Sequence, residues 1–175
     1  MTPTGKELAN NLDDTAGMLQ RQPKLSLAII VQKLDQHHQP VFLFQQRQRN
    51  PYFGFWSCIG GPVVWGEEAE VTAAKELDKQ TGIAADCKVR GFYRLRDFDQ
   101  GSGRLLEDKL FTVMQATETH GDVANTWHGG HNMWMTLDEF QRQGSYFEPV
   151  VDMIEMVQNG TTYSSGTAYY SPEQY

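Results

Sequence analysis

Cysteine, long apolar runs and positive charge are scarce in this sequence of 175 residues. Cys58 and Cys87 are the only cysteines, and their positions form neither a disulfide framework nor a metal-binding spacing. No stretch approaches the roughly 20 apolar residues that a membrane-spanning helix needs. The polar beginning of the chain also lacks the apolar region of a signal peptide. We therefore expect a cytoplasmic protein without a membrane partner.

Acidic residues outnumber basic ones, with 22 Asp and Glu against 15 Lys and Arg, so the formal net charge is −7. A sequence-independent grip on nucleic acid relies on clustered Lys and Arg. The composition therefore argues against a nucleic-acid partner, while it still allows a local cationic pocket. With 39% hydrophobic residues, the chain can bury one sizeable core, and we expect one main domain.

Local patterns outline an alternation of strands and helices. Strands are expected at 25–31, 41–44, 88–96, 109–116 and 131–135, and helices at 68–80 and 149–158. Two pairs have capping-box spacing: Thr4 with Glu7, before an N-terminal helix, and Thr136 with Glu139. Mixed strands with few helices are typical of an α/β/α sandwich.

The expected organisation has three parts. Residues 1–22 form an N-terminal helical extension, and residues 23–159 form the α/β domain. Residues 160–175 form a tail rich in Tyr, Ser and Gly, which we expect to be mobile or draped over the domain. The N-terminal helix and exposed sheet edges would support a homodimer.

The most informative stretch runs from Gly61 to Ile83 and reads GPVVWGEEAEVTAAKELDKQTGI. Most of it falls in a predicted helix, which Gly82 would end. Residues at i, i+3 and i+4 share one helix face, so Glu76, Lys79 and Gln80 are expected to project together into one site.

This stretch resembles the Nudix box, in which a Gly and a Glu precede the pattern R-E-U-x-E-E-x-G-U, where U is aliphatic. The positions that match are Gly61, Glu67, Glu76, Leu77, Gly82 and Ile83. The positions that depart are Lys75, in place of the Arg, and Lys79 and Gln80, in place of the paired Glu. Upstream, FLFQQRQRNPYFGFWSCIGG is similar to the family's strand ending in Arg, a Trp and a glycine pair. The resemblance covers roughly residues 25–158 and implies a mixed sheet between helices.

The family's activity is hydrolysis of a nucleoside diphosphate linked to another group, with Mg²⁺ or Mn²⁺ held by box carboxylates. By this resemblance Glu67 and Glu76 are the catalytic candidates, and Glu76 is the one remaining metal ligand of three. The site has lost two negative charges and gained a positive one. We therefore expect metal affinity to fall sharply and hydrolysis to be weak or lost.

Two alternatives remain open. The first is a metal-independent nucleotide-binding, diphosphate-binding or regulatory domain that needs no cofactor, in which the Lys79 ammonium replaces part of the metal and holds a ligand phosphate. The second is an enzyme similar to isopentenyl diphosphate isomerase, which typically has Cys immediately before the box glycine. Gly60 occupies that position here and Cys58 lies two residues earlier, so this alternative is the less favoured.

Four further residues are candidates for binding a small-molecule nucleotide or other diphosphate. Arg47 and Arg49 end a predicted strand, where related proteins often place an Arg against phosphate, and a planar guanidinium suits bidentate phosphate recognition. Trp65 and Trp127 fall in predicted loops and would stack on a flat group. Lys75 is expected to pair with Glu67, as the family's Arg commonly does.

Overall fold

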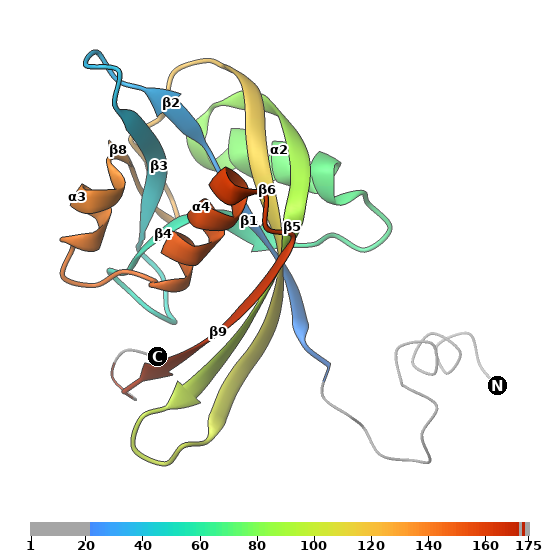
Figure 1. Cartoon of the computed structure of the whole chain (residues 1–175), viewed down its shortest axis with the longest axis vertical. Helices are drawn as coiled ribbons and strands as arrows, with labels where there is room; N and C mark the ends of the chain where they lie inside the picture. The colour runs from blue at the N-terminus through green and yellow to red at the C-terminus, as the bar shows by residue number, and fades with distance from the viewer. Residues whose placement is uncertain (1–21, 172, 174–175) are drawn as a thin grey trace.

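The computed structural model describes residues 22–171 and residue 173, so the predicted N-terminal helix lies outside the described residues. The elements, in chain order, are β1 (Lys24–Ile30), β2 (Gln32–Leu34), β3 (Pro40–Arg47), β4 (Trp56–Pro62), α2 (Ala69–Thr81), β5 (Ala84–Asp99), β6 (Leu105–His120), β7 (Thr126–Trp127), β8 (Gly130–Met135), α3 (Leu137–Gln141), α4 (Pro149–Asn159) and β9 (Tyr163–Tyr170). Figure 1 shows how they are arranged. None of the described helices is long and apolar enough to cross a membrane.

The strands form one mixed sheet in the order β7-β8-β3-β4-β1-β6-β5-β9, and β2 pairs with β3. Two neighbouring pairs, β1 with β6 and β5 with β9, are parallel, and the others are antiparallel. Helix α2 lies on one side of the sheet, and α3 and α4 lie on the other (Figure 1). The predicted α/β class with a mixed sheet is therefore confirmed.

Alternation along β1 divides the core into two clusters, because successive side chains of a strand point to opposite faces. Leu27 packs in the cluster that contains Leu77 of α2. Its neighbour Ala28 packs in the cluster that contains Ile154 of α4. Both faces of β1 are thus buried, one by the cluster on the α2 side of the sheet and the other by the cluster on the α4 side.

The sequence of α2 explains both its packing against the sheet and the position where it ends. Ala73 and Leu77 lie one turn apart and are fully buried against the sheet. Gly82 ends the helix in the left-handed conformation, with φ of 76°, and its N–H donates to the Asp78 carbonyl at 2.7 Å. Glycine adopts this conformation without steric cost. The predicted stop at Gly82 and the capping box of α3, in which Thr136 and Glu139 bond each other, are confirmed.

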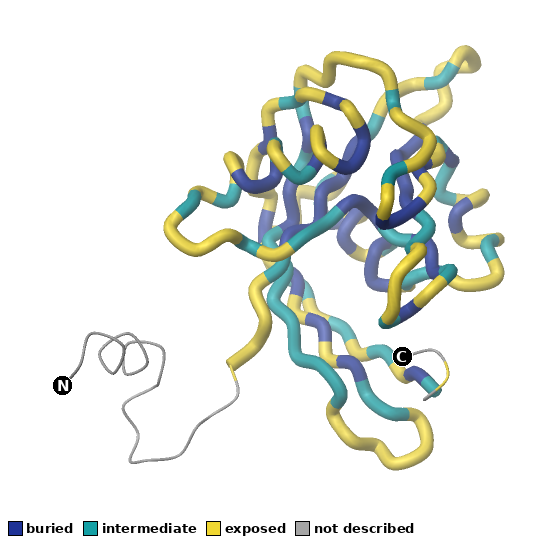
Figure 2. Tube along the Cα trace, turned by 180° about the vertical axis from the view of Figure 1, so that it is seen from behind, coloured by how far each residue is buried: buried dark blue, intermediate teal, exposed yellow. Residues whose placement is uncertain are grey.

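Strands β5 and β6 have sixteen residues each and extend well beyond the predicted ranges. Together with β9 and the start of β1 they form an arm that projects past the helices (Figure 1). Along β5 and β9, exposed positions alternate with more buried ones, whereas most of β6 is intermediate in exposure (Figure 2). We call this part of β5, β6, β9 and the start of β1 the arm.

The tail prediction needs correction, because Tyr163–Tyr170 forms the regular strand β9. The segment has few aliphatic residues, so its sequence resembles a loop. Its backbone nevertheless pairs with β5 over eight positions in unbroken register, and Tyr170 is buried against Tyr52 and Phe147. Backbone pairing and aromatic packing therefore give a regular strand to a segment that we expected to be mobile or draped over the domain.

The cluster on the α4 side depends on one aromatic stack. The Phe140 ring lies 4.0 Å from that of Phe44 and is fully buried. We expect Phe140→Ala to lower the free energy of unfolding by roughly 3–5 kcal/mol, because a large cavity would remain. Phe53→Ala is a matched control, since that ring is 67% exposed, and should change it by less than about 0.5 kcal/mol. Urea unfolding measures both, and equal effects would contradict this account of the core.

Candidate functional site

A cavity of about 330 Å³ lies among β1, β3, β4, β6 and α4. One part of its wall is apolar and consists of Leu95, Phe111, Phe147, Val150 and Met153. Another part is polar and consists of Lys24, Arg47, Tyr52, Glu107 and Lys109. The cavity also reaches Gly60 and Gly61, at the beginning of the box segment. It can therefore hold a ligand with both an apolar and a charged group.

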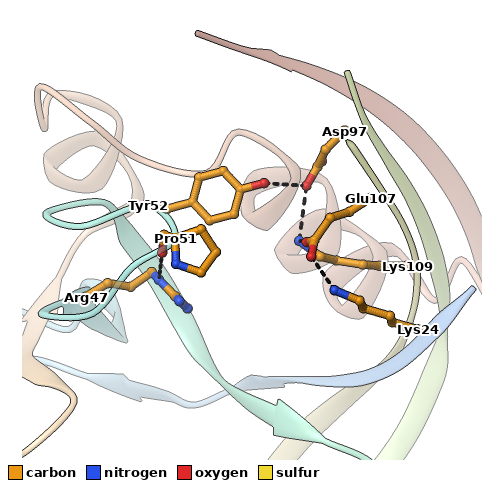
Figure 3. A network of polar contacts seen from close by, with 7 residues as sticks. All are labelled: Lys24, Arg47, Pro51, Tyr52, Asp97, Glu107 and Lys109. Atoms are coloured by element: carbon orange, nitrogen blue, oxygen red, sulfur yellow. Dashed lines mark hydrogen bonds and ion pairs between the residues drawn. The ribbon is translucent and has the colours of Figure 1, made fainter. Parts of the chain in front are cut away.

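The polar wall contains a chain of alternating charges (Figure 3). The Lys24 ammonium lies 2.5 Å from Oε1 of Glu107, and Lys109 forms an ion pair with the other oxygen of that carboxylate. Lys109 also lies 3.1 Å from Oδ2 of Asp97, which accepts a hydrogen bond of 2.8 Å from the Tyr52 hydroxyl. We call these five residues the ion network.

Strand register builds the ion network. The β1 and β6 pairing places Lys24 beside Lys109, and the β5 and β6 pairing places Asp97 beside Glu107. The Asp97 side chain is fully buried, which would be costly for a carboxylate without the ammonium and hydroxyl that contact it. Tyr52 comes from the loop between β3 and β4 and joins that loop to the arm.

Two pKa shifts follow from these contacts. Burial alone would raise the pKa of Glu107, but hydrogen bonds from Lys109 and Lys24 outweigh it and hold the pKa below its usual value. Burial, and then the charge of Asp97, raise the pKa of Tyr52 well above its usual value. Tyr52 therefore remains a hydrogen-bond donor at neutral pH, and Glu107 remains a carboxylate.

Arg47 is the cation of the cavity wall that lacks a carboxylate partner among the described residues. Its Nε donates to the Pro51 carbonyl at 3.1 Å, and the side chain is partly buried (Figure 3). Burial lowers the pKa of this guanidinium, because the charge is removed from water. The charge of Glu107 acts on Arg47 from a distance, but no described carboxylate forms an ion pair with it, so this guanidinium is suited to binding an anion.

At the box end, Glu76 lies against Gly61. A Cβ atom added at Gly61 would lie 3.1–3.2 Å from the Glu76 side chain, so only glycine leaves room for it. Oε1 of Glu76 lies 2.6 Å from the Lys79 ammonium, and Oε2 accepts from Nε2 of Gln80 at 2.7 Å. The buried Gln80 amide also donates to the Gly60 carbonyl at 2.8 Å. Both carboxylate oxygens of Glu76 are thus held by donors from its own helix.

Glu67 has separate partners at the start of the helix. Its carboxylate pairs with Lys75, as expected, and accepts a hydrogen bond of 2.6 Å from the Thr72 hydroxyl. Hydrogen bonds from Lys75 and Thr72 lower the pKa of Glu67. Among the described residues, Glu67 and Glu76 share no hydrogen-bond donor, so each carboxylate has its own set of partners.

The donor set of the box does not fit a divalent cation. Mg²⁺ takes oxygen ligands, with at least one or two carboxylates free to coordinate it. Within residues 22–171 and 173, no group of three or more His, Cys, Asp or Glu side chains is placed to hold a metal ion. Beside Glu76 the structure places an ammonium and an amide N–H, which a cation repels.

The other predicted ligand contacts lie away from the cavity wall. Trp65 is 88% exposed on the loop between β4 and α2. The Arg49 guanidinium lies over the Trp127 ring, 5.7 Å from its centroid. Neither tryptophan lines the cavity, and Arg49 does not line it either. Their roles in binding stay predictions.

Sequence patterns missed Lys24, Tyr52, Asp97 and Lys109. Each lies outside the box, and they come together only through the pairing of β1, β5 and β6 and the loop between β3 and β4. A partial signal exists in the alternation of β5, where Tyr93, Leu95 and Asp97 share the buried face. An acidic residue that continues a buried face indicates a polar partner inside the fold.

The lowered pKa of Glu107 predicts how the free energy of unfolding depends on pH. Because its pKa in the folded protein lies below its ordinary value of 4.5, the carboxylate stabilises the fold above that pH. The contribution is lost as pH falls through the lowered pKa. We expect Glu107→Gln to reduce the free energy of unfolding by about 1–2 kcal/mol at neutral pH, a modest value since Lys24 is largely exposed. The difference from the wild type should shrink below about pH 4.5.

Urea unfolding at several pH values measures this difference. Asp138→Asn is the control, because that carboxylate is 81% exposed and lies 3.9 Å from Arg142. It should have little effect at any pH. A Glu107→Gln difference that stays constant down to acid pH would show that the carboxylate does not titrate as proposed.

Three solved structures are similar to this chain in fold. A MutT protein from Bacillus halodurans is 22% identical, with a TM-score of 0.65, over 87% of this chain and 93% of that chain. The NUDIX domain of Shewanella oneidensis NrtR, solved in complex with ADP ribose, is 17% identical, with a TM-score of 0.65, over 93% of this chain and 100% of that chain. A MutT NUDIX hydrolase from Burkholderia pseudomallei is 21% identical, with a TM-score of 0.60, over 78% and 99%.

These likenesses show a shared fold. No curated protein sequence matches the chain. The family profile described as NUDIX domain matches residues 24–152, which is more than half of the 175 residues. The chain therefore belongs to the Nudix family.

Proposed function

We propose that this protein binds a nucleotide or another diphosphate in its cavity and has lost most or all metal-dependent hydrolysis. The observation that carries the proposal is the double occupation of the Glu76 carboxylate by Lys79 and Gln80. In this arrangement the positive charge that a metal would supply is already part of the chain.

Electrostatics oppose metal binding at the box. A divalent cation at Glu76 would have to displace the Lys79 ammonium and approach the donor side of the Gln80 amide. Changes to groups that merely orient a metal ligand already cost about 10–100-fold in affinity or activity. Exchange of two ligating carboxylates for an ammonium and an amide is a larger change. A resident Mg²⁺ or Mn²⁺ therefore has no suitable cage at this position.

The cavity supports binding instead of hydrolysis. Its volume of about 330 Å³ lies at the lower end of the range for small-molecule pockets, roughly 300–1,000 Å³. Arg47 is our candidate for the phosphate, because it has no carboxylate partner among the described residues. Phe111, Phe147 and Met153 form an apolar wall suited to a flat group. Lys79 is engaged with Glu76 and would act mainly as the internal substitute for metal charge.

The isomerase-like alternative gains no support from the cavity. Cys58 lines it, but the residue is only 9% exposed, and burial raises the pKa of its thiol to about 11. The thiol therefore stays protonated and poorly accessible at neutral pH. ADP ribose, the ligand in the Shewanella oneidensis complex, is a reasonable first probe for the binding proposal, together with nucleoside diphosphates.

Titration calorimetry in EDTA tests binding without metal. We expect the wild type to bind at least one of these probes, and Arg47→Gln to weaken it about 10–100-fold through loss of a charge-assisted hydrogen bond. Arg142→Gln removes a guanidinium from the exposed surface and should leave the affinity unchanged. No binding by the wild type, or equal loss in both variants, would count against the cavity as the ligand site.

Restoring acidic residues tests the loss of the metal site. The double variant Lys79→Glu with Gln80→Glu should gain measurable Mg²⁺ or Mn²⁺ affinity over the wild type, because three carboxylates would then share one helix face. Calorimetric titration with the metal alone measures the gain. A turnover screen of the wild type with Mg²⁺ or Mn²⁺ complements it. Robust turnover that disappears in Glu76→Gln would overturn the proposal.

A further inference from the structure

The outer edge of β9 is unpaired within the described residues, and the strand itself has no charge, proline or bulge to oppose strand pairing. Within the described residues, β9 lies at the end of the sheet and pairs only with β5. Natural edge strands are commonly protected by charged side chains, proline or bulges. From Thr161 to Ser171 the sequence has no charged residue and no proline, and the register with β5 has no shift. This edge is therefore chemically suited to accept another strand.

Hydrogen bonds to β5 establish which peptide groups face outward. The Thr162 carbonyl accepts from the Phe92 N–H at 2.9 Å, and the Tyr170 carbonyl accepts from the Gln100 N–H at 2.9 Å. Peptide groups alternate in direction along a strand, so the even-numbered residues face β5. The N–H and carbonyl groups of Ser165 and Thr167 consequently point to the open edge.

The sequence of β9 is nearly symmetric about Gly166. Going outward from that glycine, the paired types are Ser165 with Thr167, Ser164 with Ala168, and Tyr163 with Tyr169. An antiparallel pair of identical strands is related by a two-fold axis, so each residue of one copy meets its symmetric counterpart in the other. This symmetry favours a second copy of the chain over an unrelated strand.

The proposed register also agrees with the hydrogen bonding. With Gly166 on the two-fold axis, Ser165 lies opposite Thr167 of the second copy, and both present outward peptide groups. Antiparallel pairs alternate between hydrogen-bonded and non-hydrogen-bonded types, so this is a hydrogen-bonded pair and the glycine pair is not. The two hydroxyl side chains then lie on the same face, where Ser and Thr pairs contribute favourably.

Aromatic side chains extend the match across the sheet. Phe92 lies beside Tyr163 and Phe98 beside Tyr169 in the β5 and β9 register, and the second pair is stacked at 5.7 Å. Tyr163 and Tyr169 are 59% and 62% exposed. In the proposed pairing, Tyr163 lies opposite Tyr169 of the second copy. At each end of the interface, Phe92 and Tyr163 of one copy would then lie in a row with Tyr169 and Phe98 of the other. This row would cover apolar surface that the single chain exposes to water.

We propose that two copies of this protein associate through antiparallel pairing of β9, with Gly166 at the two-fold axis. Because the edge is uncharged, the pairing brings no like charges together. A hollow of about 370 Å³ lies between the end of β9 and the segment from Gly144 to Pro149. The interface is smaller than the roughly 1,600 Å² of a standard complex, so the dimer is concentration-dependent.

Charge-swapped edges provide the test. The first variant of the full chain carries Ser165→Lys with Thr167→Lys, and the second carries Ser165→Glu with Thr167→Glu. Each places like charges directly opposite one another in a homodimer, whereas a mixture of the two places opposite charges there. Gln36→Lys with Gln39→Lys, on the exposed turn between β2 and β3, is the matched control for added charge. Thermal unfolding establishes that every variant is folded.

Sedimentation velocity from about 1 µM to about 500 µM measures the association. We expect the wild type and the control to shift toward dimer, and each edge variant to raise the dissociation constant at least about tenfold. An equimolar mixture of the two edge variants should recover the dimer. A monomeric wild type, an undiminished dimer in either edge variant, or a mixture of folded variants that stays monomeric would each overturn the proposal. None of these outcomes bears on ligand binding in the cavity.

Discussion

The pairing of β6 with β1 on one side and β5 on the other is the constraint on which both the candidate cavity and the open edge of β9 depend. It places Lys24 and Lys109 in one rung and Asp97 and Glu107 in the next, so charges of opposite sign meet across strands. A shift of one residue in either pair would turn these side chains to the other face. The same register extends the arm that carries β9, and it therefore determines both the polar wall of the cavity and the open edge.

Two carboxylates near the cavity show how the chain compensates buried charge. Glu76 is neutralised within one helix, by a lysine three residues away and an amide four residues away. Asp97 is neutralised from two other segments, by Lys109 and Tyr52. In both places the compensating groups belong to the protein, although Oδ1 of Asp97 is buried without a hydrogen-bond partner among the described residues. Arg47 is the converse case, a cation of the cavity wall without a carboxylate partner among the described residues. The cavity is therefore biased toward an anion.

Local sequence signals were sufficient for α2, its stop at Gly82 and the capping box of α3, because each depends on residues within one or two helical turns. The pairs of Lys75 with Glu67 and Lys79 with Glu76 were also accessible from spacing. The ion network was not, since its members come from three strands and a loop, and no sequence pattern fixes their register. β9 escaped detection for a related reason. Its order comes from pairing with β5 and from burial of Tyr170, whereas its own composition is typical of a loop.

The fold tolerates the altered box because most of the contacts through which the box stabilises the structure do not involve the ligand positions. Leu77 and Ala73 bury the inner face of α2, while Gly61 gives Glu76 its room. The buried Gln80 amide bonds the Gly60 carbonyl, an interaction that a carboxylate at the same position would turn into repulsion between two acceptors. The exchange of Glu for Gln thus strengthens the attachment of α2 to β4 at the expense of a ligand position. Under the proposed function, the amide that attaches α2 to β4 is also one of the two donors that occupy the Glu76 carboxylate.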